Sequence, residues 1–172
     1  MAARRPVRIL GFDPGSRRTG FGVIELSAGG RLTYVASGSI VLGALPFNDR
    51  LRKLYTTAGA LVREQAPDEV SIERVFMHRN ADSALKLGHA RAALICATFS
   101  DAVPVFEYAA REIKQTVTGS GGAAKPQVAH MVCRLLGVQG DMGPDAADAL
   151  AAAICHANLR GRPAPALLAG RS

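Results

Sequence analysis

The sequence predicts a single α/β domain in which helices flank a mixed five-stranded sheet. Its 172 residues suit one domain with a hydrophobic core. Apolar residues make up 48% of the chain and charged residues 20%, which is typical of a globular protein. Strand patterns fill the front of the chain, and strands then alternate with helices. We therefore assign residues 1–160 to this domain and expect a flexible tail at 161–172, which has Pro, Gly and Arg but no usable pattern.

The individual elements follow from hydrophobic periodicity and turn signals. The segments with the pattern of strands are 7–13, 20–26, 31–41, 68–76 and 103–109. The first three are separated by the short links "DPGS" and "SAGG", so they are expected to form an antiparallel meander. The segments with helical spacing are 47–65, 81–99, 110–117, 123–136 and 144–158. Strand–helix–strand connections after the meander complete the mixed sheet.

Charge and cysteine usage limit the classes of function. A net charge of +7 and a pI near 9.9 favour a polyanionic partner, nucleic acid before membrane, although a soluble protein that is simply basic would fit the same values. No apolar run is long enough for a membrane span, and the N-terminus lacks the features of a secretory signal. Cys96, Cys133 and Cys155 are widely spaced, which predicts reduced thiols in a cytoplasmic protein.

Two carboxylates belong to strands in positions where a buried charge is costly. Asp13 ends the first strand and continues its row of apolar side chains. Glu73 lies within the apolar run "SIERVF" of a strand that should be interior. The structural alternatives are that Asp13 serves only the turn before Pro-Gly, and that Glu73 lies on an exposed edge strand.

Asp145 and Asp148 open the Ala-rich helix "GPDAADALAAAICHA" on one face. The helix dipole and capping favour acids at a helix start, so a structural role remains an alternative. If the first and fourth strands are neighbours and this helix begins near their ends, Asp145 and Asp148 meet the two strand carboxylates. Four such acids repel one another without cations, and carboxylates favour Mg²⁺ or Mn²⁺ over zinc. Two metal ions about 4 Å apart could clamp a phosphate for in-line displacement.

Four stretches together resemble one known family. They are "ILGFDPGSRRTGFGVI", "IERVFMHRNADSALKLGHAR", "VFEYAAREIKQTVTGSGGAAKPQVAHMV" and "DAADALAAAICH", and they are similar to the RuvC-type Holliday junction resolvases of bacteria. The resemblance extends from residue 8 to residue 158, with the blocks in the family's order. It implies a ribonuclease-H-like fold, a homodimer, and Mg²⁺-dependent cutting of four-way DNA junctions, with two ions per subunit and Mn²⁺ as a substitute. It also suggests the branch-migration helicase complex as a partner.

The same resemblance implies roles for individual residues. The catalytic and metal-binding residues that it implies are Asp13, Glu73, Asp145 and Asp148. Asp148 lies one helical turn from Asp145 and could bind the metal without it. The implied DNA contacts are Phe76 near the junction centre and Lys114 and Lys125 near the phosphates, with Arg74 and Arg79 adding positive charge to the rim. By pattern alone, Phe76 would fit the core and the lysines an ordinary solvated surface.

Two other classes of function are alternatives to a junction-cutting nuclease. A catalytically inactive junction-binding module would have lost some of the acids. An actin- or sugar-kinase-like ATPase fragment shares the turn after the first strand, but such proteins need a second domain and phosphate loop, for which 172 residues leave no room. For the homodimer, helix 81–99 has a stripe of small residues that could form the interface or could instead pack on its own sheet: Ala81, Ala84, Gly88 and Ala92.

Overall fold

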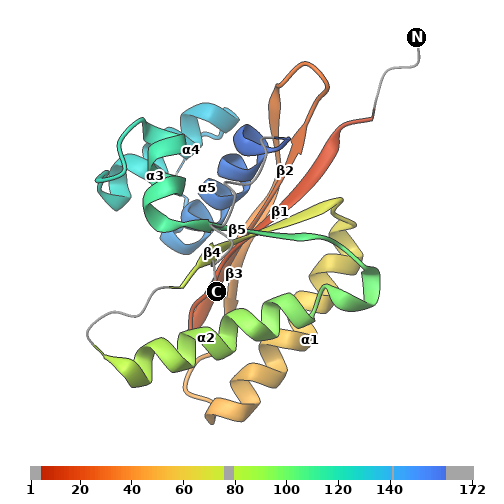
Figure 1. Ribbon diagram of the computed structural model, residues 1–172, viewed down its shortest axis with the longest axis vertical. Helices are drawn as coiled ribbons and strands as arrows, with labels where there is room; N and C mark the ends of the chain where they lie inside the picture. The colour runs from red at the N-terminus through yellow and green to blue at the C-terminus, as the bar shows by residue number, and fades with distance from the viewer. Residues whose placement is uncertain (1–4, 76–79, 141, 162–172) are drawn as a thin grey trace, which may run out of the picture.

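The computed structural model describes residues 5–75, 80–140 and 142–161, and its strands form one mixed sheet (Figure 1). The strands are β1 (Val7–Asp13), β2 (Arg18–Leu26), β3 (Leu32–Val41), β4 (Glu69–Arg74) and β5 (Val105–Ala109). Their order across the sheet is β3-β2-β1-β4-β5. The β1–β2 and β2–β3 pairs are antiparallel, whereas the β1–β4 and β4–β5 pairs are parallel. This arrangement confirms the predicted five-stranded mixed sheet.

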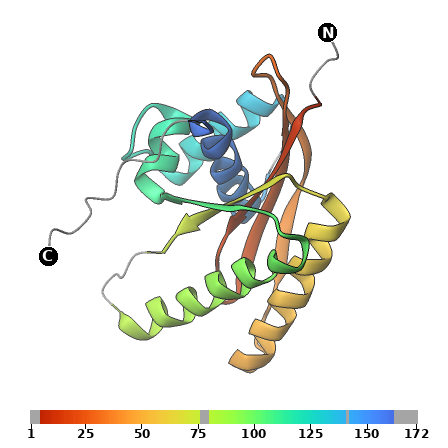
Figure 2. The ribbon, with the colours of Figure 1, turned by 45° about the vertical axis from the view of Figure 1, so that its right-hand side comes forward.

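Helices cover both faces of the sheet, as Figures 1 and 2 show. Helices α1 (Phe47–Gln65) and α2 (Ala81–Cys96) lie on one face, and a 3₁₀ turn, η1 (Phe99–Asp101), follows α2. Helices α3 (Ala110–Thr118), α4 (Lys125–Leu136) and α5 (Pro144–Leu159) lie on the other. Each face has its own hydrophobic core, which explains why α5 is buried along nearly its whole length.

Strand β1 is the centre of the sheet and contributes to both cores. Ile9 packs into the core beneath α5, whereas Leu10 and Phe12 pack into the core beneath α1 and α2, and all three are fully buried. A strand covered on both faces reads as a continuous apolar run, which is the pattern of residues 9–12. The alternation along the strand places Asp13 on the α5 face, as predicted.

Some predicted boundaries differ from the structure. The fourth strand ends at Arg74 rather than 76, and residues 76–79 lie outside the described ranges. The predicted helix 81–99 ends at Cys96, because the Thr98 hydroxyl donates to the Ile95 carbonyl at 2.8 Å and the chain tightens into η1. The predicted tail falls almost wholly outside the described residues and stays a prediction. No helix in the described ranges is long and apolar enough to cross a membrane.

The small-residue stripe of α2 lies outside the buried core beneath the helix. The buried residues of α2 are Ala90 and Leu94, which belong to that core. Ala81 and Ala92 are exposed, whereas Ala84 and Gly88 are half-buried. A Cβ added at Gly88 would meet no atom within 4 Å, so this part of the helix has room for a close neighbour.

Candidate active site

Asp13 is held at the end of β1 by the tight turn that joins β1 to β2. The fully buried Thr19 hydroxyl donates to the Gly15 carbonyl at 3.1 Å and lies 3.3 Å from the Gly15 amide nitrogen. From α1, the Arg50 guanidinium donates to the Ser16 carbonyl at 2.7 Å. The turn is therefore fixed from both sides, and the Asp13 carboxylate cannot swing away with a loose loop.

Glu73 lies at the corresponding end of the neighbouring strand. Strand β4 pairs in parallel with β1 on one side and β5 on the other, so Glu73 is not on an edge strand and that alternative is excluded. Ser71 faces α5, because its buried hydroxyl donates to the Ala152 carbonyl at 2.8 Å. Two residues further on, Glu73 points to the same face, toward the start of α5.

Three glycines allow α5 to lie unusually close to the sheet. A Cβ at Gly20 would be 1.9 Å from the backbone oxygen of Asp145, and one at Gly11 would be 2.1 Å from that of Ala149. Gly11 is paired with Gly22, where a Cβ would be 2.5 Å from the side chain of Leu150. Only glycine permits these approaches, and they bring the first turn of α5 against the ends of β1 and β2.

Where the ends of β1 and β4 meet the start of α5, simultaneous ionisation of all the acids is strongly unfavourable. Burial raises the pKa of Asp13 to about 7, with further contributions from the negative charges of Glu73 and Asp148. Burial also raises the pKa of Glu73, and Asp148 adds to this effect. Asp145 contributes least to the Asp13 shift in pKa, which is consistent with a position further from the strand acids. Such perturbed carboxyl groups are typical of functional sites.

Three cations from other elements offset part of this negative charge. Lys125, the first residue of α4, places Nζ 2.6 Å from Oδ2 of Asp148. Lys114 on α3 lowers the pKa of Glu73 through its positive charge, although the net shift remains upward. Arg18 at the start of β2 has Nε 3.5 Å from Oδ2 of Asp145. The two lysines therefore approach the acids themselves rather than a separate surface.

The four acids match the chemistry of a divalent cation, but they are not gathered around one point as they stand. Within the described ranges, no three Asp, Glu, His or Cys side chains form a group that could hold a metal ion. Asp148 is instead paired with Lys125. Carboxylate oxygens are the ligands that Mg²⁺ prefers, and a cation would relieve the repulsion that raises the pKa of Asp13. The donor set therefore fits Mg²⁺ once the side chains turn toward a common ion.

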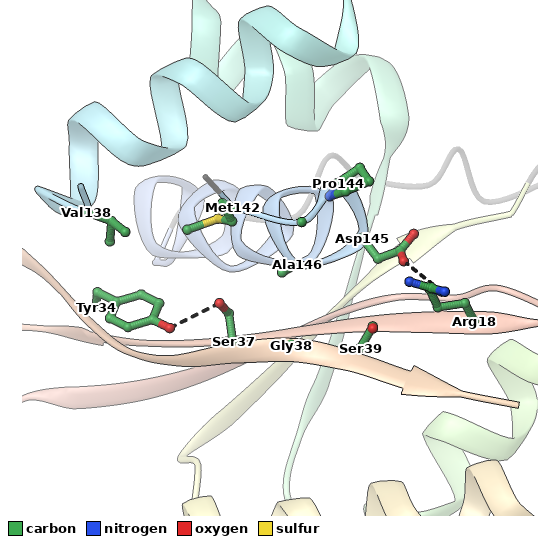
Figure 3. A pocket seen from close by; sticks show the side chains of 11 residues that line it. Arg18, Tyr34, Ser37, Gly38, Ser39, Val138, Met142, Pro144, Asp145 and Ala146 are labelled. Atoms are coloured by element: carbon green, nitrogen blue, oxygen red, sulfur yellow. Dashed lines mark hydrogen bonds and ion pairs between the residues drawn. The ribbon is translucent and has the colours of Figure 1, made fainter. Parts of the chain in front are cut away.

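A pocket of about 300 Å³ opens beside Asp145 (Figure 3). Asp145 and Arg18 lie at one end, and the Tyr34 and Ser37 hydroxyls, 3.1 Å apart, lie further along β3. Asp145 thus has access to solvent on its pocket side: its side chain is 31% exposed, against 18% for Asp148.

The structure does not place the predicted DNA contacts Arg74, Phe76 and Arg79 beside the acids. Arg74 is exposed and alternates to the face of the sheet opposite Glu73, where its guanidinium donates to the Glu107 carbonyl at 3.3 Å. Phe76 and Arg79 lie outside the described residues. Sequence reasoning missed Arg18 and the role of the glycines. The alternating glycines in "GFG" at 20–22, read together with Gly11, were a signal for a close-packed helix.

Comparisons with known proteins agree with this geometry. Residues 9–156 match the family "Crossover junction endodeoxyribonuclease RuvC". The protein of that name from Xanthomonas oryzae pv. oryzae is 53% identical over 154 residues, which cover 89% of this chain and 88% of the relative. That from Methylococcus capsulatus is 49% identical, over 89% of this chain and 92% of the relative.

A solved structure extends the likeness to three dimensions. The structure of T. thermophilus RuvC in complex with Holliday junction substrate superposes with a TM-score of 0.81 at 30% identity, covering 88% of this chain and 93% of that one. The ribonuclease-H-like fold implied by the sequence is therefore confirmed. The family match spans β1, β4 and the start of α5, which carry the four acids. By sequence, fold and extent of the match, this chain belongs to the crossover junction endodeoxyribonuclease RuvC family.

Proposed function

We propose that this protein is a structure-selective endonuclease that resolves Holliday junctions in DNA recombination and repair, through two symmetric, metal-dependent phosphodiester cuts. The observation that carries the proposal is that Asp13 at the end of β1 and Glu73 near the end of β4 meet the start of α5, which carries Asp145 and Asp148. The T. thermophilus relative, which was solved with a Holliday junction, supports the choice of substrate. Family membership and the retention of all four acids disfavour both the inactive binding module and the ATPase fragment.

The acids would share the work of holding the metal. Asp13, Glu73 and Asp148 are the proposed ligands of Mg²⁺, with two ions per subunit and Mn²⁺ as a substitute. Asp145 is the proposed fourth ligand and is more solvent-accessible than Asp148. Bound Mg²⁺ would stabilise the charge on the scissile phosphate and activate the attacking water. Lys125 offsets the charge of Asp148, and with a metal ion bound there its long side chain would be free to contact the DNA phosphates.

A cleavage assay on a labelled synthetic four-way junction tests this function, with a linear duplex of the same sequence as control. We expect Mg²⁺ or Mn²⁺ to give paired nicks at symmetric positions on the junction and little cutting of the duplex. Binding without cutting in the presence of Mg²⁺ would indicate the inactive module. Equal cutting of both substrates would contradict structure selectivity, and ATP hydrolysis by the protein alone would favour the ATPase.

DNA contacts are proposed for five residues on the basis of family likeness. Lys114 and Lys125 are supported by their position beside the acids. Arg74 has weaker support, because it lies on the opposite face from Glu73. Phe76 and Arg79 follow Glu73 along the chain, and their roles rest on the resemblance alone.

A homodimer is proposed because two symmetric cuts require two active sites, which a two-fold dimer supplies. The candidate interface is α2, where the stripe of small residues at Ala81, Ala84, Gly88 and Ala92, exposed or half-buried, would allow close approach. Leu85 on the same helix is 63% exposed in the single chain, and an exposed side chain this apolar supports a surface that a second subunit covers. Sedimentation at micromolar concentration should give a dimer, and Ala84→Arg should give a monomer. A dimer that survives this change would exclude α2 as the interface.

The cellular setting is proposed on more general grounds. Action on DNA and three free cysteines support a cytoplasmic location. The branch-migration helicase complex that acts on the same junctions is the proposed partner, on the basis of family likeness. Co-purification of the two from cell extract with a four-way junction present is the expected result, and its absence would count against this partner.

A further inference from the structure

A second group of ionisable side chains lies at the end of α5 away from the acids. His156 is 1% exposed, and its Nε2 lies 2.7 Å from Oε2 of Glu69, the first residue of β4. Its Nδ1 lies 2.7 Å from the hydroxyl of Tyr108 on β5, and the Phe106 ring stacks on the imidazole with centroids 4.3 Å apart. Arg160 Nε donates to both Glu69 oxygens, at 2.9 and 2.7 Å.

Every polar atom of the buried imidazole has a partner. Burial lowers the pKa of His156, despite the opposing effect of Glu69, so the ring is neutral at physiological pH. Burial raises the pKa of Tyr108 to about 12, so its hydroxyl remains a proton donor. The pattern that satisfies both nitrogens has Tyr108 donating to Nδ1 and Nε2–H donating to Glu69. Burial alone would raise the pKa of Glu69, but hydrogen bonds from Arg160 and His156 outweigh it and lower the value.

This group is one step of a regular alignment between β4 and α5, which run in opposite directions. Three residue pairs relate the two elements, spaced by two along the strand and by four along the helix: Glu69–His156, Ser71–Ala152 and Glu73–Asp148. Two strand residues advance about 6.6 Å and four helical residues about 6 Å, so the pairs stay in step. The first two pairs are hydrogen-bonded, whereas the third is repulsive, because it pairs two carboxylates of like charge.

The repulsive pair, Glu73–Asp148, lies where the metal is expected. Its repulsion would push α5 away from β4, and the two hydrogen-bonded pairs oppose that displacement. A rigid helix transmits a displacement along its axis, so a contact at one end constrains the other. We propose that Glu69, His156 and Tyr108 are positioning residues, which fix α5 along β4 and so hold Asp148 where it can share a metal ion with Glu73. This inference rests on the metal-dependent cutting proposed above. It assigns a role to residues that touch neither DNA nor metal.

Variants of Glu69 separate positioning from general stability. Glu69→Ala removes the acceptor of His156 Nε2–H, whereas Glu69→Gln keeps an acceptor there. The control is Val62→Ala, a buried residue of α1 on the opposite face of the sheet, chosen to lower the melting temperature to a similar degree. For each protein, the Mn²⁺ dissociation constant is measured without DNA by electron paramagnetic resonance. The Mg²⁺ concentration for half-maximal single-turnover cutting of a four-way junction is measured in parallel.

We expect Glu69→Ala to raise both values about tenfold, the lower end of the scale seen for groups that orient metal ligands. Glu69→Gln should raise them by no more than about threefold, because it keeps an acceptor for His156. Val62→Ala should leave both unchanged. Mn²⁺ affinity in Glu69→Ala equal to that of the wild type would overturn the inference. If Glu69→Ala does not fold, Tyr108→Phe decides: a rise of about threefold supports positioning, and no rise contradicts it.

The two proposals fail in different ways. A wild-type protein that binds Mn²⁺ but never cuts a junction contradicts the proposed function, while the Mn²⁺ constants still test the positioning role. A wild-type protein that cuts normally, with a Mn²⁺ affinity that none of these variants changes, contradicts the positioning role alone.

Discussion

Both ends of α5 gather ionisable side chains, but the two groups differ in their electrostatic balance. At the start of the helix, burial and neighbouring acids raise the pKa values of Asp13 and Glu73, and the carboxylates are only partly offset by lysines. At the far end, Arg160 and His156 lower the pKa of Glu69 against the effect of burial. The start of α5 therefore lies in a cluster of like charges that repel one another, whereas the ionisable groups at its far end have partners of complementary charge or hydrogen-bonding capacity.

The contrast shows how a fold can tolerate a site built for a ligand. Carboxylates placed for divalent cations are destabilising until the cations bind, so the stability that holds them must come from elsewhere. Here it comes from the apolar length of α5, from the Ser71 hydrogen bond and from the satisfied group around His156. The functional end of the helix is consequently the end where substitution can increase stability.

The largest effect is expected from removing one carboxylate of the repulsive end. Asp13→Asn or Glu73→Gln should reduce junction cutting by about a thousandfold or more, since metal stabilisation of the transition state contributes several kcal/mol. Binding of the uncut junction should persist or strengthen, because a negative charge near the phosphates is lost. Gel-shift and single-turnover assays on the same preparations measure both. Substantial cutting by Asp13→Asn would contradict the site as described.

Asp13→Asn should be more stable than the wild type when no metal is present. The pKa of Asp13 rises from 3.8 to about 7 on folding, so its contribution to stability is full below pH 4 and lost as the pH rises to 7. At pH 8 without Mg²⁺, Asn at this position should therefore stabilise the fold, by at most about 4 kcal/mol at 1.36 kcal/mol per pKa unit. Urea unfolding at pH 4 and pH 8 measures the difference, which should vanish at pH 4. Adding Mg²⁺ should stabilise the wild type more than the variant, and equal responses would refute metal binding through Asp13.

A smaller loss is expected from separating α5 from the sheet. Gly20→Ala places a Cβ where the backbone oxygen of Asp145 lies, and overpacking of this kind costs about 1–3 kcal/mol. Because the clash is with the first turn of α5, we also expect half-maximal cutting to require a higher Mg²⁺ concentration. Gly122→Ala is the matched control, since Gly122 is exposed and a Cβ there would meet only the Ser120 hydroxyl, at 4.0 Å. Similar stability for both variants would mean that the close approach is not required.

The smallest effects concern the two lysines near the acids. Replacing Lys114 by Ala should weaken junction binding equally across sequences and lower the salt slope of log K by about one. Lys125→Ala should do the same to binding, and it should also raise the pKa of Asp13 further, because Lys125 currently lowers it. Fluorescence anisotropy over a range of KCl concentrations distinguishes these effects. An unchanged slope in both variants would remove the lysines from the DNA surface.

Much of the fold and the location of the acids could be predicted from local pattern. The two-residue period of β1 placed Asp13 on one face of the sheet, and the three-residue spacing of Asp145 and Asp148 placed both on one face of a helix. The family resemblance then indicated which acids act together. These inferences depend on neighbours in sequence, where periodicity is informative.

The remaining features depend on contacts between distant segments. Lys125 meets Asp148 only because α4 packs across the start of α5, and Gly20 meets Asp145 across 125 residues of chain. Nothing local in the sequence marks His156, because a single histidine on an apolar helix has no local signal of its partners. Its role depends on the alignment of α5 with β4 and of β4 with β5, which only the folded sheet defines.

The contrast between the two ends of α5 is tested most directly by following individual carboxyl groups by ¹³C NMR as the pH is changed. Without Mg²⁺, Asp13 should titrate with a pKa of about 7, whereas Glu69 should titrate below its ordinary value of 4.5. Saturating Mg²⁺ should bring the apparent pKa of Asp13 down sharply and leave that of Glu69 unchanged, because a metal ion competes with protons only at the repulsive end. An Asp13 pKa near 3.8 without metal, or one that Mg²⁺ does not move, would contradict the assignment of this site.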